Sequence, residues 1–342
     1  MLLSHRVTLY TTRRRRGVKT QGFSGNAVRT ILGLGIVAVL GAGVLLAVEH
    51  PNLYNRPPAR VEMAPASFYS PALYTPMGKP QPGDWIQAHP EPAQSFHEYV
   101  TSRPLRPTAA RHTLVLCQVG PMAEADRQRL RLLGEFLGLY YTLPVRLGPA
   151  VELKGVVSRE RTMARRKFRQ YLTTDILEKV LKPEVPKDAM CLLGVTMEDL
   201  YPAESWNYVF GQATFDDRVG LYSLVRFYPA FWGREATAEA EQQGLVRSLQ
   251  TLVHETGHMF GVAHCQKYEC VMNGSNSLEE SDRRPIHLCP ECLKKFRWNI
   301  GFDLVARYEA LKKFYEGHAM KAEAEWVAKR IAECRPAAAP AG

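Results

Sequence analysis

The stretch 254-HETGHMFGVAHCQKYECVMNG-274 decides the fold of this chain of 342 residues. It continues a run whose apolar residues recur with helical spacing, which predicts a core helix. His254 and His258 are four residues apart, so on a helix both imidazoles lie on one face and can bind one metal ion. Glu255 lies beside them, placed to polarise a water molecule rather than to bind the ion. The stretch therefore predicts a zinc site on a buried helix.

A third histidine, His264, can join the first two only if the chain leaves the helix. On a continuing helix, His264 would lie about 15 Å along the axis from His254, whereas zinc–nitrogen bonds are about 2.0–2.1 Å long. Gly261 can take the left-handed conformation that ends a helix, so we predict a turn there. Ordinary helical histidines are the alternative. At average composition, the five residues of this pattern should occur by chance on the order of once in ten thousand such chains.

Four cysteines follow at metal-ligand spacing: Cys265, Cys270, Cys289 and Cys292. A C-x4-C pair followed by a C-x2-C pair predicts a four-thiolate structural zinc site. Two disulfides are the alternative, and an oxidising compartment would favour them. Cys117 and Cys191 lie in apolar runs elsewhere and are predicted to be buried thiols.

The N-terminal part is interpreted as a membrane anchor. Residues 1–30 contain seven basic and no acidic residues, so they supply seven of the ten net positive charges of the chain. Residues 31–48 are eighteen apolar residues without a charge, near the lower limit of about 17–25 for a bilayer-spanning helix. A cleaved signal peptide and an organellar presequence are the alternatives. The positive-inside bias predicts the N-terminus on the cytoplasmic or matrix side, with the rest of the chain across the membrane.

Proline then sets the domain boundaries. Residues 49–110 hold twelve of the 23 prolines, and proline removes a backbone donor and fixes φ. Residues 49–82 are predicted as a linker, either a stalk or an extended wrap over the following domain. Residues 83–316 are predicted as one catalytic domain, and residues 317–342 as a C-terminal helix and a disordered tail.

Within the domain, strand and helix patterns alternate. Residues 113–120 and 190–197 are short apolar runs that predict buried strands, whereas 123–141 has helical spacing. Residues 165–182 are predicted as a second amphipathic helix. Residues 206–215 and 219–229 flank a polar turn and are predicted to pair as strands. The expected fold is α/β (α+β), with a mixed twisted sheet, an active-site helix and a helical C-terminal subdomain.

The motif HExxHxxGxxH with a downstream methionine resembles the metzincins, and the cysteines after it are similar to those of the archaemetzincin family. The similarity extends through four more segments: GDW (83–85), TMEDLYP (196–202), WNYVFGQA (206–213) and VGLYSLVRFYP (219–229). The resemblance implies a metzincin-like zincin fold and a zinc metallopeptidase with two zinc ions. By the same resemblance, His254, His258 and His264 hold the catalytic zinc, and Glu255 is the general base. Met272 is then the Met-turn residue beneath the metal, and the four cysteines hold a structural zinc.

The expected partner is a peptide or protein substrate. By analogy it would lie as an extended strand along a sheet edge supplied by residues 219–228. A zinc-binding protein that no longer hydrolyses peptides is the alternative, but a binding-only site has no need of Glu255. Residues 266–288 are close to neutral, whereas a phosphate-binding surface is strongly basic, so no nucleic-acid partner is expected.

Overall fold

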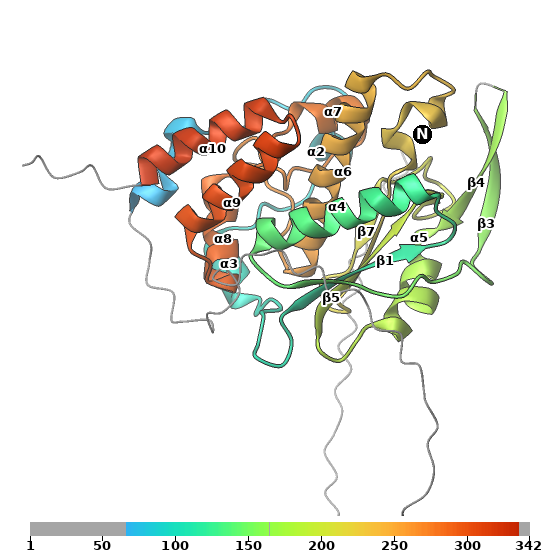
Figure 1. Ribbon diagram of the computed structural model, residues 1–342, viewed down its shortest axis with the longest axis horizontal. Helices are drawn as coiled ribbons and strands as arrows, with labels where there is room; N and C mark the ends of the chain where they lie inside the picture. Colours follow the sequence, from blue (N-terminus) through green and yellow to red (C-terminus); the bar gives the residue numbers. More distant parts are fainter. Residues whose placement is uncertain (1–65, 164, 335–342) are drawn as a thin grey trace, which may run out of the picture. The chain divides into compact units, whose positions relative to one another are not determined.

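The computed structural model describes residues 66–163 and 165–334, which belong to one compact unit (Figure 1). The predicted basic segment 1–30, the predicted anchor 31–48 and the end of the tail, 335–342, lie outside the described residues. Within the described part of the chain, no helix combines the length and apolar composition needed to cross a bilayer. The fold can therefore be examined from residue 66 onward.

A five-stranded sheet lies at the centre of the unit. Its order is β2 (Val145–Leu147), β1 (Thr113–Val119), β5 (Ala189–Thr196), β8 (Val219–Ser223) and β7 (Gly211–Ala213). The first four strands are parallel, and β7 is antiparallel to β8. Every residue of β5 is buried, as expected for a central parallel strand that is covered on both faces. The predicted strands at 113–120 and 190–197 and the predicted pairing of β7 with β8 are confirmed.

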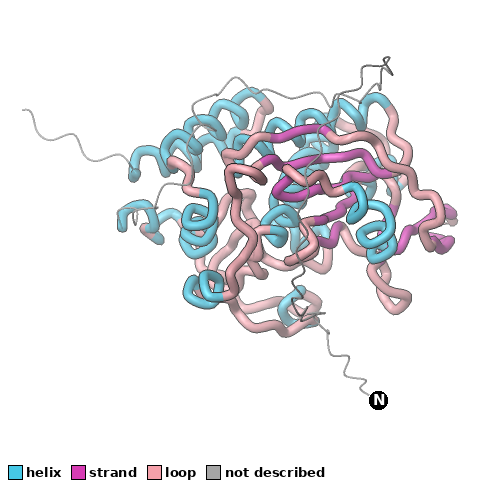
Figure 2. Tube along the Cα trace, turned by 90° about the horizontal axis from the view of Figure 1, so that it is seen from below, coloured by secondary structure: helices cyan, strands magenta, loops and turns pink. Residues whose placement is uncertain are grey.

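Successive side chains of β1 enter two different cores, because side chains alternate across a strand. Leu114 and Leu116 pack in the larger core with α4 (Glu124–Tyr141) and α6 (Ala238–Met259). Val115 and Cys117 pack on the other face with η3 (Ile176–Leu181), which lies in the chain between the short turns α5 (Thr173–Asp175) and η4 (Lys182–Glu184). Figure 2 shows the strands lying between helical segments. The predicted mixed α/β fold is therefore confirmed.

Helices alone form the C-terminal part, as predicted: α7 (Leu278–Arg283), α8 (Pro290–Ile300), α9 (Leu304–Gly317) and α10 (Lys321–Cys334). Between β8 and α6 the chain makes two short 3-10 turns, η5 (Val225–Phe227) and η6 (Pro229–Trp232). α10 packs against α9.

The prediction of a helix over 165–182 is wrong in its first half. Residues 166–172 form β4 (Arg166–Leu172), which pairs antiparallel with β3 (Ser158–Met163) and parallel with β6 (Asp199–Tyr201). The hairpin extends away from the central sheet (Figure 1). Its buried amide, Gln170, donates to the carboxylate of Asp199 at 2.7 Å. Pairing with the adjacent β3 and the more distant β6 decided the conformation here, and a short apolar period cannot reveal such pairing.

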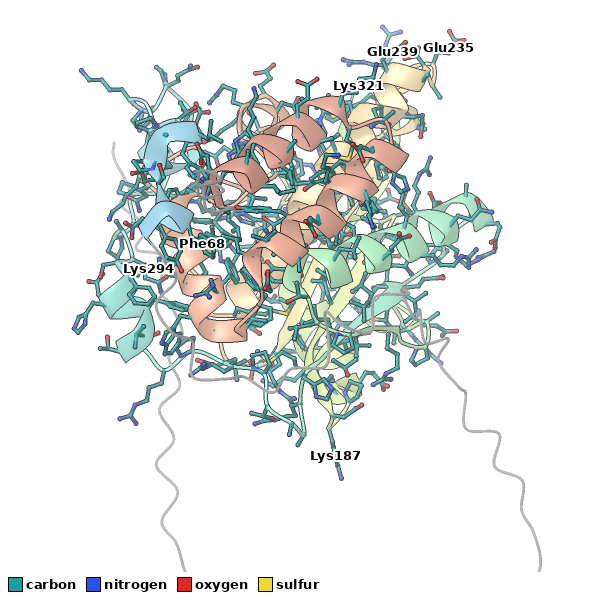
Figure 3. The ribbon with its side chains drawn as sticks, turned by 60° about the vertical axis from the view of Figure 1, so that its left-hand side comes forward. Phe68, Lys187, Glu235, Glu239, Lys294 and Lys321 are labelled. Atoms are coloured by element: carbon teal, nitrogen blue, oxygen red, sulfur yellow. The ribbon has the colours of Figure 1, made fainter. Side chains whose placement is uncertain are left out.

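The described part of the proline-rich segment packs against the C-terminal helices. It contains two short 3-10 turns, η1 (Ala66–Tyr69) and η2 (Pro71–Leu73). Figure 3 shows Phe68 beside these helices. The indole of Trp326 donates to the carbonyl of Leu73 at 3.2 Å, and Arg330 donates to the carbonyl of Phe68 at 2.7 Å. Of the two predicted forms, stalk or wrap, the described residues form a wrap.

Candidate active site

Helix α6 carries the first two histidines and ends just beyond them. It stops at Met259, and Gly261 then takes a φ of +80°, so the predicted left-handed turn is confirmed. The chain reverses and brings His264 to the other two, with one ligand atom of each histidine within 4.8 Å of the others. The Nε2 atoms of His254 and His258 are 3.0 Å apart. Three residues spread over eleven positions thus meet at one point.

The hydrogen bonds of the three imidazoles fix their tautomers. Each Nδ1 faces an acceptor: His254 the carbonyl of Val271 (2.8 Å), His258 the carbonyl of Val262 (2.7 Å) and His264 the carboxylate of Glu91 (2.5 Å). A carbonyl can only accept, so Nδ1 carries the proton and Nε2 keeps a free lone pair. Two lone pairs facing each other at 3.0 Å repel unless a cation lies between them. The arrangement fits a bound metal ion.

Burial favours the same neutral state. It lowers the pKa of His258 to about 3 and that of His254 well below the usual range, and the neighbouring histidines lower both further. Metal binding requires deprotonated ligands. His254 and His258 are therefore held in the form that binds a divalent cation such as zinc.

Glu255 is buried beside the triad, against the outermost strand of the sheet. A Cβ built on Gly211 of β7 would lie 2.7 Å from Glu255 Oε1, so the carboxylate touches the strand backbone. Burial raises the pKa of Glu255 to about 8, and the nearby Arg284 opposes this rise. A carboxyl group with such a pKa can both accept and release a proton near neutrality.

Met272 lies beneath α6, between the turns that carry His254 and His258. It is fully buried, and its sulfur is 2.5 Å from the Cβ position of Gly257. Its carbonyl accepts a hydrogen bond from the amide of Cys265 at 2.8 Å. The residue singled out as the Met-turn methionine thus packs directly against the histidine helix.

The four predicted zinc-binding cysteines gather at a second centre. They are buried and unpaired, and their sulfur atoms lie within 4.8 Å of one another. Cys265 Sγ and Cys289 Sγ are 3.6 Å apart, far longer than a disulfide bond of about 2.05 Å. Sulfurs around a tetrahedral zinc with bonds of about 2.3 Å would be about 3.8 Å apart. The spacing fits a shared metal ion better than two disulfides.

Sequence reasoning missed Asn273, which joins the two centres. Its side chain accepts from the amide of Cys270 at 2.7 Å and donates to the carbonyl of Cys265 at 2.7 Å. Its own carbonyl accepts from Arg284 at 2.6 Å, and the same Arg284 nitrogen is 3.4 Å from Nδ1 of His254. An asparagine after the Met-turn methionine is a weak turn signal, and nothing in the sequence marks Arg284.

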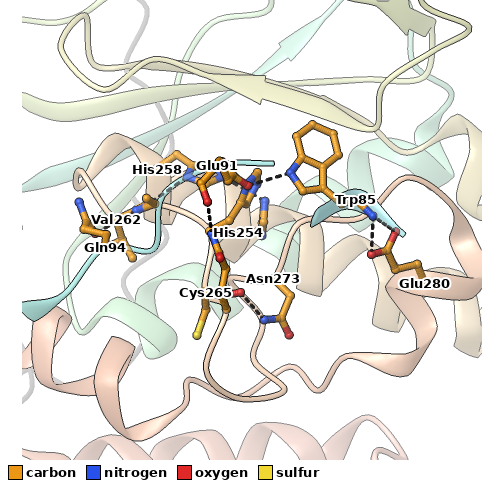
Figure 4. A network of polar contacts seen from close by, with 12 residues as sticks. Trp85, Glu91, Gln94, His254, His258, Val262, Cys265, Asn273 and Glu280 are labelled. Atoms are coloured by element: carbon orange, nitrogen blue, oxygen red, sulfur yellow. Dashed lines mark hydrogen bonds and ion pairs between the residues drawn. The ribbon is translucent and has the colours of Figure 1, made fainter. Parts of the chain in front are cut away.

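Sequence reasoning also missed Glu91, the partner of His264. Its carboxylate bonds to His264, and it also accepts from the indole Nε1 of Trp85 at 2.8 Å; Figure 4 shows Glu91 and Trp85 joined in this way. Partial burial would raise its pKa, but the hydrogen bonds from His264 and Trp85 lower the pKa of Glu91 below its usual value. A single glutamate between two prolines carries no spacing signal toward a histidine 173 residues later.

One prediction about the site is corrected. The sheet edge was expected within residues 219–228, but β8 lies between β5 and β7, and residues 225–227 form a 3-10 turn. The outermost strand beside the site is β7. A turn flanked by two strand patterns does not tell which strand is outermost, because the order in a sheet depends on pairing with a third strand.

The fold and the site together define a class of protein. Three histidines converge on one centre, two of them from a helix that also carries a buried glutamate, beside the last strand of a mixed sheet. This is the arrangement of a metallopeptidase whose metal is held by an HExxH helix and a third histidine.

Comparisons with known proteins agree with this class. Residues 144–298 match the model of peptidase family M54. Archaemetzincin-2 of Homo sapiens is 35% identical over 272 residues, covering 71% of this chain and 75% of that protein. Archaemetzincin-1 of Homo sapiens is 30% identical over 255 residues, covering 67% of this chain and 51% of that protein. The chain belongs to the archaemetzincin family, and it is a metallopeptidase, an enzyme that hydrolyses peptide bonds.

Solved archaemetzincin structures are also similar to parts of this chain. The protein from Archaeoglobus fulgidus is 28% identical with a TM-score of 0.41, and covers 54% of this chain and 99% of its own. The protein from Methanopyrus kandleri is 27% identical with a TM-score of 0.44, and covers 56% of this chain and 97% of its own.

Proposed function

We propose that His254, His258 and His264 hold the catalytic zinc ion of this peptidase and that Glu255 is its general base. The observation that carries the proposal is the tautomer of the triad, with every Nδ1 hydrogen-bonded and every Nε2 left free around one centre. A zinc ion held by three histidines supplies a Lewis acid that polarises a carbonyl and lowers the pKa of water.

Glu255 moves the proton. Its carboxylate accepts a proton from the attacking water and then gives it to the leaving amine. Its burial supports this role, because an apolar environment makes the protonated form accessible near neutral pH. Its place against Gly211 puts this proton transfer at the outer strand of the sheet.

The substrate would bind as an extended strand along β7. Within the described sheet β7 pairs only with β8, so its other edge is open to a peptide. Backbone hydrogen bonds to a sheet edge give affinity without demanding particular side chains. A peptide bound there would pass Glu255, which touches β7 at Gly211.

The second zinc ion would be structural. Cys265, Cys270, Cys289 and Cys292 supply four ligands and leave no open position for water. All four are buried, so the ion would hold the chain rather than meet substrate.

Residues 31–48 would anchor the protein in a membrane, with the catalytic domain on the far side from the basic segment 1–30. Eighteen uncharged apolar residues with a cationic flank support this proposal. Full-length protein should then need detergent, and added protease should reach the catalytic domain only from the side opposite the arginines. Full-length protein that stays in solution without detergent after losing its first forty or so residues would indicate a cleaved signal.

The change Glu255→Gln tests the mechanism. Glutamine cannot accept the proton, and glutamate is not a ligand in this proposal, so peptide hydrolysis should fall by about a hundredfold or more while zinc content stays the same. Cleavage of a peptide library and metal analysis would be measured on the same preparations. Glu325→Gln, at an exposed position of α10, is the matched control. If Glu255→Gln keeps most of the wild-type rate, Glu255 is not the base.

A further inference from the structure

We propose that Glu91 is a positioning residue that fixes the third histidine, His264, in the orientation for binding zinc. Glu91 belongs to a segment that we call the strap, residues 84–101, which contains α2 (Trp85–Ala88) and α3 (Phe96–Thr101). The strap lies outside residues 144–298, where the family model matches. This inference rests on the proposed function, because it assigns the strap a task at the proposed zinc site.

His264 differs from the other two histidines in what supports it. His254 and His258 are held by α6, and their Nδ1 atoms donate to backbone carbonyls. His264 lies on the loop after the helix, and its Nδ1 bonds to the carboxylate of a distant segment at 2.5 Å. A loop residue has no helix to fix its orientation, so the partner of its ring determines where Nε2 points.

The strap restrains the His264 ring from two sides. Glu91 Oε1 accepts from both His264 Nδ1 (2.5 Å) and Trp85 Nε1 (2.8 Å), so the carboxylate is itself held in place. The Trp85 indole packs against the His264 imidazole with ring centres 5.2 Å apart at 71°. The hydrogen bond sets the direction of the ring, and the indole limits its tilt.

Glu91 cannot be a metal ligand in this arrangement. Glu91 is not among the described residues whose ligand atoms converge with the histidines, and it bonds to Nδ1 of His264, which leaves Nε2 as the nitrogen free to bind a metal ion. A carboxylate on Nδ1 holds the tautomer and raises the basicity of Nε2 toward the metal. Its effect on zinc therefore passes through His264.

The strap is fastened to the same loop at two further points. The side chain of Gln94 donates to the carbonyl of Gly261 at 3.0 Å and accepts from the amide of Ala263 at 3.1 Å. The Tyr99 hydroxyl donates to the carbonyl of Phe260 at 3.0 Å. The whole reversal from Phe260 to His264 is thus bound to the strap, which gives Glu91 a rigid support.

Zinc affinity in the full-length protein tests this role. Glu91→Ala removes the acceptor, Glu91→Gln keeps an acceptor of the same shape without the charge, and Asp84→Asn is the control. Asp84 starts the strap and pairs with Arg283 on α7, without contact to His264 in the network. Zinc would be titrated against a chromophoric chelator, with thermal unfolding measured for each variant and kcat and KM for a cleaved peptide.

We expect Glu91→Ala to weaken zinc binding at one of the two sites by about 10–100-fold and Glu91→Gln to fall between it and wild type. Asp84→Asn should match wild type in zinc affinity and in kcat. In Glu91→Ala, kcat should fall with little change in KM. Wild-type zinc affinity in a folded Glu91→Ala or Glu91→Gln protein would overturn the inference. So would an equal loss in Asp84→Asn, since strap docking alone would then explain it. Wild type that binds no zinc at the histidines would instead overturn the proposed function.

Discussion

At the residue scale, Gly211 is the point where the sheet meets Glu255, the proposed general base. Its Cβ would lie 2.7 Å from Glu255 Oε1 and 2.8 Å from the Tyr222 side chain, closer than side chains approach one another. Gly211→Ala must therefore displace Glu255 or push β7 outward. We expect kcat/KM to fall by about a hundredfold, because a shift of about 1 Å at a reacting group can cost that much.

Kinetics on a cleaved peptide would check this expectation, with zinc content measured in parallel. Gly317→Ala is the control, because nothing lies within 4 Å of the Cβ position at the end of α9. Zinc should remain bound in both variants, since Gly211 touches no histidine of the triad. Full activity in Gly211→Ala would mean that the Glu255 carboxylate does not act where the structure holds it.

The spacing of residues in the sequence predicts the candidate metal ligands, but not the side chains that hold those ligands in place. The histidines and Glu255 could be read from the sequence because a helix relates positions four apart and a glycine allows the reversal. Glu91 supports His264 from 173 residues away. No period connects positions so distant, so only the folded chain reveals such partners.

At the element scale, the four cysteines connect the loop that follows α6 to the start of α8. Cys289 is the N-cap of α8 and its sulfur accepts from the amide of Cys292 at 3.4 Å, so the proposed structural zinc would hold the start of that helix. The side chain of Asn273, next to Met272, donates to the carbonyl of Cys265. It thereby joins the turn at Met272 to the loop that carries the first two cysteines. Loss of this ion should therefore disturb folding and not only metal content.

We expect purified protein to carry two zinc ions. His258→Ala should lose one while the fold persists, whereas Cys289→Ser should lose one and unfold at a clearly lower temperature. Cys334→Ser, a buried cysteine outside the cluster, is the control that keeps both ions. Metal analysis, thiol titration and circular dichroism would measure these outcomes. One zinc ion together with no free thiols among the four cysteines would indicate disulfides instead.

The segment 166–172, predicted as helix, shows what apolar spacing alone cannot decide. Arg166 to Leu172 have an apolar spacing that a helix can also satisfy, yet they form a strand because β3 and β6 offer hydrogen-bond partners. The helical turns begin at Thr173, where the chain covers the second face of the sheet. Strands such as β5, buried at every position, are predictable because their apolar run is short and unbroken.

At the scale of the whole molecule, the N-terminal wrap and the C-terminal helices support one another and, through them, the metal sites. Tyr74 is buried among the rings of Tyr268, His287 and Trp326, and Tyr268 lies between Cys265 and Cys270. The wrap also bonds directly to the loop between Cys265 and Cys270, since the amide of Glu269 donates to the carbonyl of Thr75 at 2.9 Å. The composition of a proline-rich segment predicts only that it is extended, so these contacts could not be foreseen.

Protein that begins at residue 66 should therefore be more stable than protein that begins at residue 83. The shorter chain lacks Tyr74 and the carbonyls that Trp326 and Arg330 bind. Removal of one buried aromatic side chain costs about 3–5 kcal/mol, so we expect Tm to fall by at least about 5 °C. Thermal unfolding of the two proteins would measure the difference. Tyr74→Ala in the longer protein should reproduce most of it, and equal Tm values for the two lengths would mean that the wrap lies on the surface without stabilising it.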